Sequence, residues 1–349
     1  MAGSVTTRRA NLAAVLDRPG SVRVEERPVP VPGPREVLVR IASVGVCGSD
    51  VHYFREGRIG DFVVTAPLVL GHEASGRVVE LGPGASGPPA GTLVAIEPGV
   101  PCRHCDQCRA GRYNLCPYVR FLATPPVDGA FTGYLAVPED FCYPVPESMS
   151  PDEAALIEPL SVGVWACRKA GVRAGDQVLV AGAGPIGLVT ALVAGASGAR
   201  VTICDVNPAR LKRAADLGVA VTADLRHREL SGLGPASSFI ECTGADGLAG
   251  QGLSALAPAG TAVLVGMSAQ DELRLPLSLL QTRELVVTGT FRYANCYPAA
   301  IALAASGAVP LASLVDAVFS LRQAQDALQA TSHDPSLVKV VVHPLEEVR

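Results

Sequence analysis

The sequence of 349 residues lacks any long basic stretch, and its net charge is −4. Proteins that bind nucleic acid or an anionic membrane surface usually carry a basic patch, so we expect neither partner. The first 16 residues lack the continuous apolar segment and cleavage site of a secretory signal, which favours a cytoplasmic protein. Internal repeats and low-complexity tracts are also missing, which argues against a repeat architecture.

Charged residues are scarce, at 18%, whereas 48% of the residues are hydrophobic. This balance is typical of a compact α/β protein rather than a disordered chain. The length exceeds the roughly 100–200 residues of one domain, so we expect two domains. An uncharged window at 177–199 is long enough to cross a bilayer, but its β-branched start and glycine-rich break predict a buried strand-turn-helix unit.

Two patterns divide the chain. Up to about residue 150, short β-rich runs alternate with Gly/Pro turns, which predicts an antiparallel, barrel-like domain. These runs are 11–16, 21–27, 36–45, 76–81, 92–96 and 131–137. A helix should follow, because Ser150 and Glu153 have the spacing of a capping box, and we expect Pro159 to interrupt it.

From 176 to 291, β runs alternate with helical stretches, which predicts a doubly wound parallel sheet. Its strands are predicted at 178–181, 200–204, 219–222, 238–242, 261–266 and 285–290. The tail should add helices near 298–306 and 321–331 and an edge strand at 337–342, and so return to the first domain. The predicted domains are therefore 1–160 with 292–349, and 161–291.

A dinucleotide site is predicted at Gly182, Gly184 and Gly187, a G-x-G-x-x-G run between a strand and a helix. The glycines allow a tight turn, close approach of a pyrophosphate and packing of helix on strand. Asp205 ends the next strand, where its carboxylate can accept hydrogen bonds from a ribose and repel a 2′-phosphate. NAD is therefore expected rather than NADP, while Arg210 would either offset this repulsion or stack beside the adenine.

Ten cysteines in an intracellular chain argue for metal ligation or burial before disulfides. Four of them share one loop: Cys102, Cys105, Cys108 and Cys116. Four thiolates can close tetrahedrally around zinc at about 2.3 Å, which predicts a structural site. An iron–sulfur cluster is the competing interpretation, but ferredoxin runs have a different spacing before the last cysteine. Small core residues are predicted at Cys142, Cys167, Cys204, Cys242 and Cys296.

Further candidates for chemistry are Cys47, at the end of a β run, and the adjacent His72 and Glu73. Taken singly, each of these side chains also has an ordinary structural explanation. Glu158 lies within the apolar run 154–160, where an unpaired charge would be costly. Some partner should therefore compensate Glu158.

Four segments resemble zinc-dependent medium-chain dehydrogenases, and in particular their sorbitol (polyol) dehydrogenase branch. They are VCGSDVHY at 46–53, LGHEASG at 70–76, IEPLSVG at 157–163 and GTFRY at 289–293. The resemblance covers nearly the whole chain. It implies an α/β fold with a β-rich, GroES-like catalytic domain and a Rossmann domain, and a homo-oligomer, either dimer or tetramer.

The resemblance also implies residue roles. Cys47, His72 and Glu73 would ligate a catalytic zinc, with Glu158 bound through water or directly, so that the third protein ligand stays open between the two glutamates. The proton relay would use Ser49 and His52, and the alternative route would use the zinc-bound water and Glu158. The substrate would contact Tyr53, Phe121, Glu158, Arg292 and Tyr293. Besides the glycines, Asp205 and Arg210, the cofactor would contact Pro185, Ile186, Val265, Gly266, Met267, Thr290, Phe291 and Arg292.

The expected reaction interconverts a polyol of the sorbitol or xylitol type and its ketose by hydride transfer from a zinc-bound alkoxide to NAD. Two zinc ions per chain are expected, one catalytic and one structural. A zinc alcohol or amino-alcohol (threonine-type) dehydrogenase is the alternative within this fold. A non-catalytic NAD-binding protein is the alternative of another class, and the joint retention of Cys47, His72, Glu73 and Glu158 argues against it.

Overall fold

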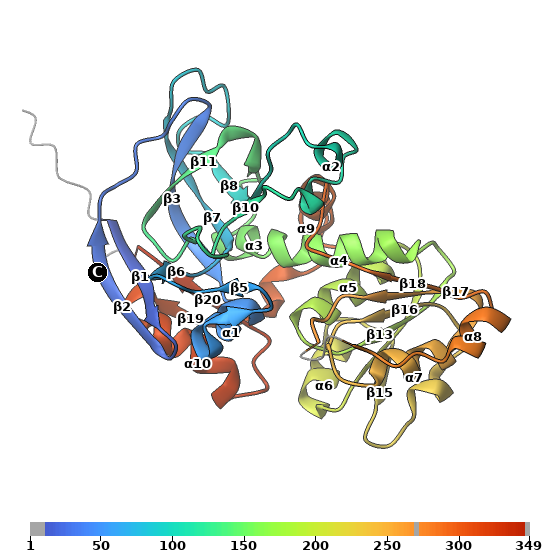
Figure 1. Ribbon diagram of the computed structural model, residues 1–349. Helices are drawn as coiled ribbons and strands as arrows, with labels where there is room; N and C mark the ends of the chain where they lie inside the picture. Colours follow the sequence, from blue (N-terminus) through green and yellow to red (C-terminus); the bar gives the residue numbers. More distant parts are fainter. Residues whose placement is uncertain (1–10, 269–271, 346–349) are drawn as a thin grey trace, which may run out of the picture. The chain divides into compact units, whose positions relative to one another are not determined.

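The computed structural model describes residues 11–268 and 272–345, which form two compact units (Figure 1). The first unit contains the described residues up to Pro101, then Tyr118–Leu156 and the chain from Val315 onward. The second unit contains Cys102–Pro117 and Ile157–Leu314. Residues 1–10, most of the segment in which no secretory signal was expected, lie outside the described residues.

The first unit is built mainly from antiparallel strands. Its largest sheet has the order β12-β8-β7-β3-β20-β19, and β11 also pairs with β3. These strands are β3 (Glu36–Gly45), β7 (Glu73–Leu81), β8 (Leu93–Ile96), β11 (Tyr134–Pro138), β12 (Cys142–Pro144), β19 (Val315–Ser320) and β20 (Lys339–His343). Smaller sheets contain β1 (Asn11–Arg18), β2 (Ser21–Arg27), β4 (Arg58–Ile59), β5 (Phe62–Val63), β6 (Leu68–Val69), β9 (Gly99–Val100) and β10 (Arg120–Phe121). The prediction of a β-rich first domain is confirmed.

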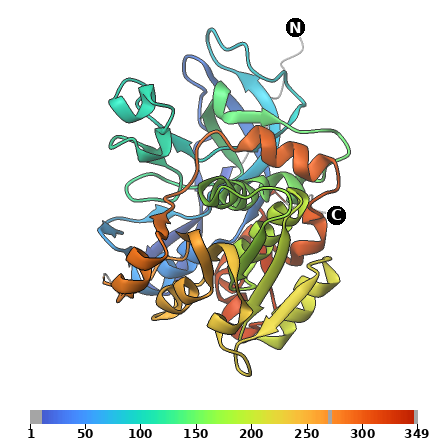
Figure 2. The same cartoon turned by 90° about the vertical axis from the view of Figure 1, so that its right-hand side faces the viewer.

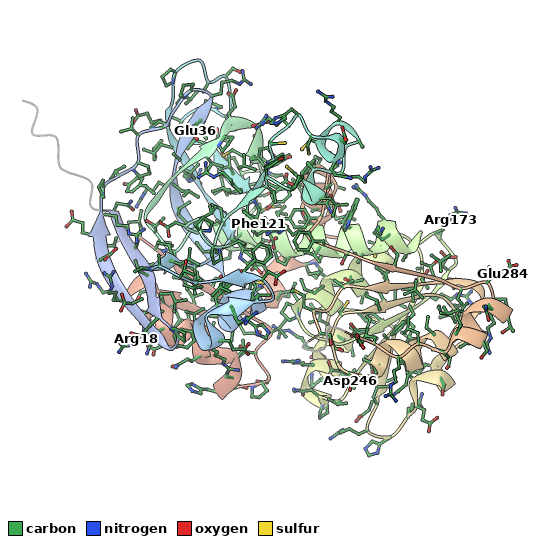
Figure 3. The ribbon with its side chains drawn as sticks, in the orientation of Figure 1. Arg18, Glu36, Phe121, Arg173, Asp246 and Glu284 are labelled. Atoms are coloured by element: carbon green, nitrogen blue, oxygen red, sulfur yellow. The ribbon has the colours of Figure 1, made fainter. Side chains whose placement is uncertain are left out.

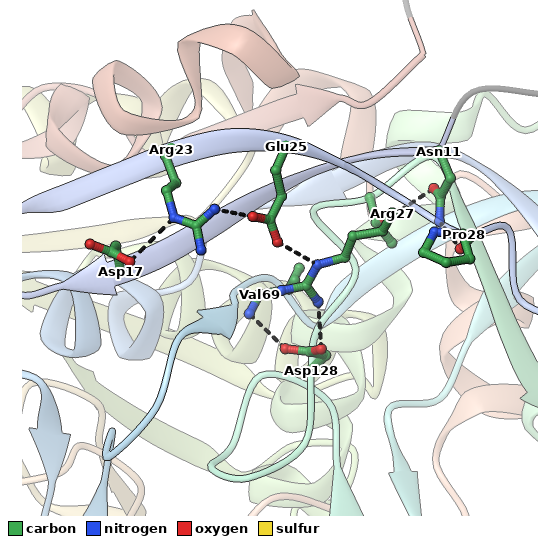
Figure 4. A network of polar contacts seen from close by, with 9 residues as sticks. Asn11, Asp17, Arg23, Glu25, Arg27, Pro28, Val69 and Asp128 are labelled. Carbon is green, nitrogen blue, oxygen red and sulfur yellow. Dashed lines mark hydrogen bonds and ion pairs between the residues drawn. The ribbon is translucent and has the colours of Figure 1, made fainter.

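A polar network joins β2 to β6 within the sheet β2-β1-β6, just before the segment that carries His72 and Glu73 (Figure 4). Asp128 accepts one hydrogen bond from Arg27 Nη1 at 2.7 Å and another from the Val69 N–H at 2.8 Å. Arg27 also donates to Glu25 at 2.9 Å. Because Val69 ends β6, the network fixes the start of the chain that leads to His72.

The strand predicted at 337–342 exists as β20, but its position at a sheet edge is wrong. β20 pairs with β3 on one side and with β19 on the other. No strand was predicted at 315–320, where β19 supplies the second neighbour. The consecutive buried valines at 340–342 are typical of a strand covered on both faces.

Helices of the first unit are α1 (Gly48–Glu56), α3 (Pro151–Ala155) and α10 (Ala324–His333). The predicted capping box is confirmed, because the Glu153 N–H donates to Ser150 Oγ and the Ser150 N–H donates to Glu153 Oε2. The predicted break at Pro159 is wrong: the interruption falls at Leu156, before α4 (Ile157–Ala170). Pro159 lies in the first turn of α4, where a backbone N–H has no partner within the helix.

The second unit contains the predicted parallel sheet, in the order β15-β14-β13-β16-β17-β18. Its strands are β13 (Gln177–Ala181), β14 (Arg200–Asp205), β15 (Val221–Asp224), β16 (Ala236–Glu241), β17 (Leu256–Leu264) and β18 (Val286–Gly289). Its longer helices besides α4 are α5 (Pro185–Ala196), α6 (Pro208–Asp216), α7 (Leu248–Ser254), α8 (Leu277–Thr282) and α9 (Tyr297–Ala305). Figures 1 and 2 show the sheet, and α4 and α7 both pack against β16 and β17, from opposite sides in Figure 1. This order confirms the doubly wound topology.

The uncharged window at 177–199 forms β13, the glycine turn and α5, as predicted. Among residues 11–268 and 272–345, no helix has the length and apolar character needed to span a bilayer.

Two segments pack with a different unit from the one that the expected domain boundaries assign them to. The loop at 102–117 and residues 292–314 both pack with the sheet unit, whereas the chain from Val315 packs with the first unit. Packing alone does not define a domain, so the division at residues 160 and 291 stays a prediction.

Two helical glycines provide a test of the core packing. A Cβ added at Gly252 of α7 would lie 2.0 Å from the ring of the fully buried Phe239, whereas one added at the exposed Gly195 of α5 would meet nothing within 4 Å. We therefore expect Gly252→Ala to lower the free energy of unfolding by about 1–3 kcal/mol, and the control Gly195→Ala to raise it by up to about 1 kcal/mol. Thermal unfolding of both variants measures this, and a loss at Gly195 as large as that at Gly252 would contradict the packing.

Candidate functional site

Asp50 connects the two segments that carry Cys47 and His72. Cys47 precedes α1, and its N–H donates to Asp50 Oδ2 at 3.0 Å, while the Gly71 N–H donates to Asp50 Oδ1 at 2.9 Å. The same Oδ1 lies 3.7 Å from His72 Nδ1, and Asp50 is completely buried. The Asp50 carboxylate therefore orients both candidate ligands.

Glu73 begins β7 and faces Gly45 on the neighbouring strand β3. A Cβ at Gly45 would lie only 1.9 Å from Glu73 Oε2, so glycine leaves the space that the carboxylate occupies. Lys339 of β20 donates to both Glu73 oxygens, at 2.7 and 2.6 Å, and to the Val46 carbonyl at 3.1 Å. The Lys339 and Glu73 side chains are only 3% and 1% exposed, so this is a buried ion pair.

The ligand atoms of Cys47, His72 and Glu73 all lie within 4.8 Å of one another. A thiolate, an imidazole and a carboxylate form the three-ligand set that catalytic zinc accepts, with the fourth position left for substrate or water. Burial lowers the pKa of His72, but the charges of Cys47 and Asp50 raise that pKa by more, to well above its ordinary value. The surroundings thus favour positive charge, and the residues present fit a divalent cation.

The other predicted site residues of the first unit differ in their exposure, and Phe121 lies against His72. The Phe121 ring, labelled in Figure 3, has its centroid 5.5 Å from that of His72. Tyr53 on α1 is buried and Ser49 is partly buried. His52 is exposed, and its Nδ1 lies 3.6 Å from Glu56 Oε1.

The four-cysteine segment 102–117, called the cysteine lobe below, gathers its sulfurs around one point. The four Sγ atoms lie within 4.8 Å of one another, with Cys102 to Cys108 at 3.9 Å and Cys105 to Cys108 at 3.4 Å. A tetrahedron of sulfurs around zinc has edges of about 3.8 Å, so the lobe fits that ion. Desolvation raises the pKa of Cys102, but hydrogen bonds from the backbone of His104 and Cys105 outweigh it and lower the pKa to about 6, which favours a thiolate.

All ten cysteines lie within the described residues, and none of them forms a disulfide there. Of the five predicted as core residues, four are buried and Cys242 is half-buried.

The glycine turn has the geometry predicted for binding a pyrophosphate. Gly182 has a φ of +96°, and a Cβ at Gly187 would lie 1.7 Å from the Gly182 carbonyl oxygen. Gly184 precedes α5, and a Cβ there would meet only Arg210 Nη1, at 4.0 Å. The start of α5, with its unpaired N–H groups and positive end, is therefore open to an anion.

Asp205 lies beside this turn at the end of β14. Its Oδ2 accepts the Ala183 N–H at 2.7 Å, and its Oδ1 accepts the Asn207 N–H at 2.8 Å. These bonds hold the carboxylate against the glycine turn, and the nearby Arg210 Nη1 brings a positive charge to the same place.

Residues that follow β17 and β18 make up the rest of the predicted cofactor set. The N–H groups of Val265 and Gly266 donate to the Glu241 carbonyl at 2.8 and 3.0 Å. Met267 is 70% exposed, and the Thr290 N–H donates to the Leu264 carbonyl. Arg292 stacks over the Phe291 ring at 4.7 Å from its centroid.

Glu158 has a partner inside the second unit, as its apolar surroundings required. Tyr293 Oη donates to Glu158 Oε1 at 2.8 Å, and both side chains are buried. The structure thus pairs two residues that the sequence analysis had assigned to the substrate.

Asp50, Gly45 and Lys339 were not identified as site residues from the sequence. Lys339 had a visible signal, because it is a single charge inside the apolar run 338–342. Asp50 stands in the VCGSDVHY segment, but its bond to Gly71 joins residues 21 positions apart. Such a contact has no local signature.

The Lys339–Glu73 pair predicts a metal-dependent effect on stability. Lys339→Met leaves a buried carboxylate without its partner, so the metal-free variant should lose about 3–5 kcal/mol of unfolding free energy. Zinc bound beside Glu73 replaces the lost positive charge, so the loss relative to the unsubstituted protein should be smaller in zinc-loaded samples.

Melting temperatures of chelator-treated and zinc-loaded samples measure this difference. The control is Lys212→Met, which removes an exposed pair with Asp216 and should cost less than about 1 kcal/mol in either state. Equal losses for Lys339→Met with and without zinc would show that Glu73 does not contact the metal.

Two family models match the chain. Residues 33–147 match the alcohol dehydrogenase GroES-like domain, and residues 185–306 match the zinc-binding dehydrogenase family. These ranges contain all four cysteines of the lobe, His72 and Glu73, and Asp205.

Similar proteins cover nearly the whole chain. Sorbitol dehydrogenase from Gallus gallus is 44% identical over 92% of this chain and 93% of its own length. Among solved structures, an oxidoreductase/dehydrogenase of unknown specificity from Escherichia coli has a TM-score of 0.92 at 33% identity, covering 97% of this chain and 100% of its own. L-idonate 5-dehydrogenase from Escherichia coli has a TM-score of 0.90 at 29% identity, covering 96% and 99%. The chain therefore belongs to the zinc-binding dehydrogenases with an alcohol dehydrogenase GroES-like domain.

Proposed function

We propose that this protein is an NAD-dependent zinc polyol dehydrogenase that interconverts a polyol of the sorbitol or xylitol type and its ketose. The observation that carries the proposal is the cluster of half-buried Cys47 with buried His72 and Glu73, in a chain 44% identical to a sorbitol dehydrogenase over most of its length. A decaying, non-catalytic relative would have no reason to keep this cluster together with Gly45, which makes room for Glu73.

Two zinc ions per chain have different functions in this proposal. Cys47, His72 and Glu73 would hold the catalytic ion, which would supply a Lewis acid that lowers the pKa of a bound hydroxyl. The cysteine lobe holds the structural ion. Lys339 affects which glutamate is the third ligand. Its ammonium group contacts both oxygens of Glu73 and so competes with zinc for that carboxylate. Glu158 remains the alternative ligand, either direct or through a water molecule.

The cofactor in this proposal is NAD, with its pyrophosphate at the start of α5 and its adenosine ribose at Asp205. Bound there, NAD would supply the hydride acceptor, and the protein would supply its orientation. Ser49 and His52 of α1 provide a path for the released proton, and the exposed position of His52 is suited to exchange with solvent.

A polyol is favoured over a simple alcohol by the polar groups assigned to the substrate. Tyr293, Glu158 and Arg292 all offer hydrogen bonds, and Tyr293 and Glu158 are buried. Buried polar groups that a substrate leaves unsatisfied weaken its binding, so neighbouring hydroxyls are an advantage. Tyr53 and Phe121 complete the proposed substrate set.

We also propose a cytoplasmic homo-oligomer, either dimer or tetramer. Thiolates of the lobe require a reducing compartment, which supports the location. β18 is the last strand of the parallel sheet in the described residues, and Val286 on it is 52% exposed. An exposed edge with apolar side chains is suited to pairing with a second copy.

Cofactor choice tests the role of Asp205. We expect NAD to be preferred, and Asp205→Ser to reduce the ratio of kcat/KM for NAD over NADP at least about tenfold, because it removes both a ribose acceptor and the repulsion of a 2′-phosphate. The matched control is Asp216→Ser, an exposed acid on α6 that should leave the ratio unchanged. Equal use of NAD and NADP by the unsubstituted enzyme would contradict the assignment of Asp205.

Glu158→Ala tests the polyol site. NADH formation should be faster with sorbitol or xylitol than with ethanol or threonine, and Glu158→Ala should lower the polyol turnover at least about tenfold, or ~1.4 kcal/mol, with the zinc content kept. Loss of one zinc with the activity would make Glu158 a direct ligand. Near-normal turnover would remove Glu158 from the reaction, and a preference for ethanol or threonine would refute the polyol assignment.

A further inference from the structure

The segment 291–295 connects β18 to α9 and carries Arg292 and Tyr293, and the cysteine lobe holds it at both ends. At the first end, Asn114 Nδ2 donates to the Phe291 carbonyl at 2.8 Å. At the other end, the Asn295 N–H donates to Tyr113 Oη at 2.8 Å, and Asn295 Nδ2 donates to the Gly111 carbonyl at 2.9 Å. Three hydrogen bonds between the lobe and this segment thus lie on either side of Tyr293 in the sequence.

The backbone of this segment needs such support. Arg292 and Asn295 have φ angles of +55° and +56°, in the left-handed region that disfavours side chains with a Cβ. Conformations of this kind persist only where the surroundings hold them. The hydrogen bonds to Tyr113 and Gly111 stabilise this backbone conformation directly at Asn295.

Helix α4 completes the arrangement, because it bears two groups that meet the same segment. Tyr293 Oη donates to Glu158 in the first turn of α4, and Arg168 Nη1 in its last turn donates to the Asn295 carbonyl at 2.7 Å. Asn295 is therefore fixed between the lobe and α4. A change in the lobe contacts at Asn295 should move Tyr293, two residues away, relative to Glu158.

We propose that the cysteine lobe positions Tyr293 against Glu158 for polyol binding, with Tyr113 and Asn295 as positioning residues. The inference rests on the proposed function, which places Tyr293 and Glu158 at the substrate. Besides stabilising the fold, the lobe then has a second function. It sets the geometry of the hydrogen bonds that select a polyol.

Tyr113→Phe is the main test, because it removes only the hydroxyl that accepts the Asn295 N–H. We expect kcat/KM for sorbitol or xylitol to fall about fivefold, while KM for NAD, zinc content and melting temperature stay unchanged. Asn295→Gly is the second variant, since glycine keeps the left-handed backbone and the N–H but loses the bond to Gly111. It should lower kcat/KM in the same direction.

The decisive readout is a double-mutant cycle with Tyr293→Phe. If Tyr113 acts through the Tyr293 hydroxyl, Tyr113→Phe should change kcat/KM less than about twofold once that hydroxyl is gone. The matched control is Gln107→Ala, which removes an exposed bond between Gln107 and Arg112 inside the lobe and should not affect polyol kinetics in either background.

Two results would overturn the inference while leaving the proposed function intact. One is normal polyol kcat/KM in both Tyr113→Phe and Asn295→Gly. The other is an equal fall for Tyr113→Phe with and without the Tyr293 hydroxyl, which would mean that the lobe acts only on general stability. A separate result would contradict the proposed function itself. If Tyr293→Phe alone leaves polyol kinetics unchanged, Tyr293 has no substrate role, and the inference about the lobe is then also wrong.

Discussion

The ion pair between Lys339 and Glu73 joins residues 266 positions apart in the chain and lies inside the first unit. A buried pair of this kind is tolerated only with good geometry and further hydrogen bonds, and here the ammonium contacts both carboxylate oxygens and the Val46 carbonyl. Val46 directly precedes Cys47. The last strand of the chain therefore holds two of the three candidate zinc ligands in place.

The same constraint, that a buried carboxylate needs a partner, shapes the remaining sites. Asp50 accepts two backbone N–H groups beside Cys47 and His72, and Asp205 accepts two more beside the glycine turn. Glu158 takes its hydrogen bond from Tyr293. Apart from Asn207, each partner is itself a predicted site residue or the immediate neighbour of one. Compensating a buried charge and arranging the reacting groups are thus achieved by the same contacts.

The sequence predicted those features whose cause is local. The glycine turn, the four clustered cysteines, the Ser150–Glu153 capping box and the six parallel strands each have a short-range signature. Features that depend on contacts between distant segments were missed or misplaced. The pairing of β20 with β19, the Lys339–Glu73 contact and the docking of the cysteine lobe on residues 291–295 are set by tertiary packing. The helix break predicted at Pro159 was wrong for a related reason, since the effect of a proline depends on where the helix begins.

X-ray absorption at the zinc edge, combined with metal analysis, tests whether Cys47, His72 and Glu73 form a metal site separate from the lobe. We expect about two zinc ions per chain, with an average environment between four sulfurs and a mixed sulfur, nitrogen and oxygen set. In Cys105→Ser, which weakens the lobe site, the remaining zinc should show the mixed set alone. A single zinc bound only by sulfur, or iron in place of zinc, would show that Cys47, His72 and Glu73 do not form a separate zinc site.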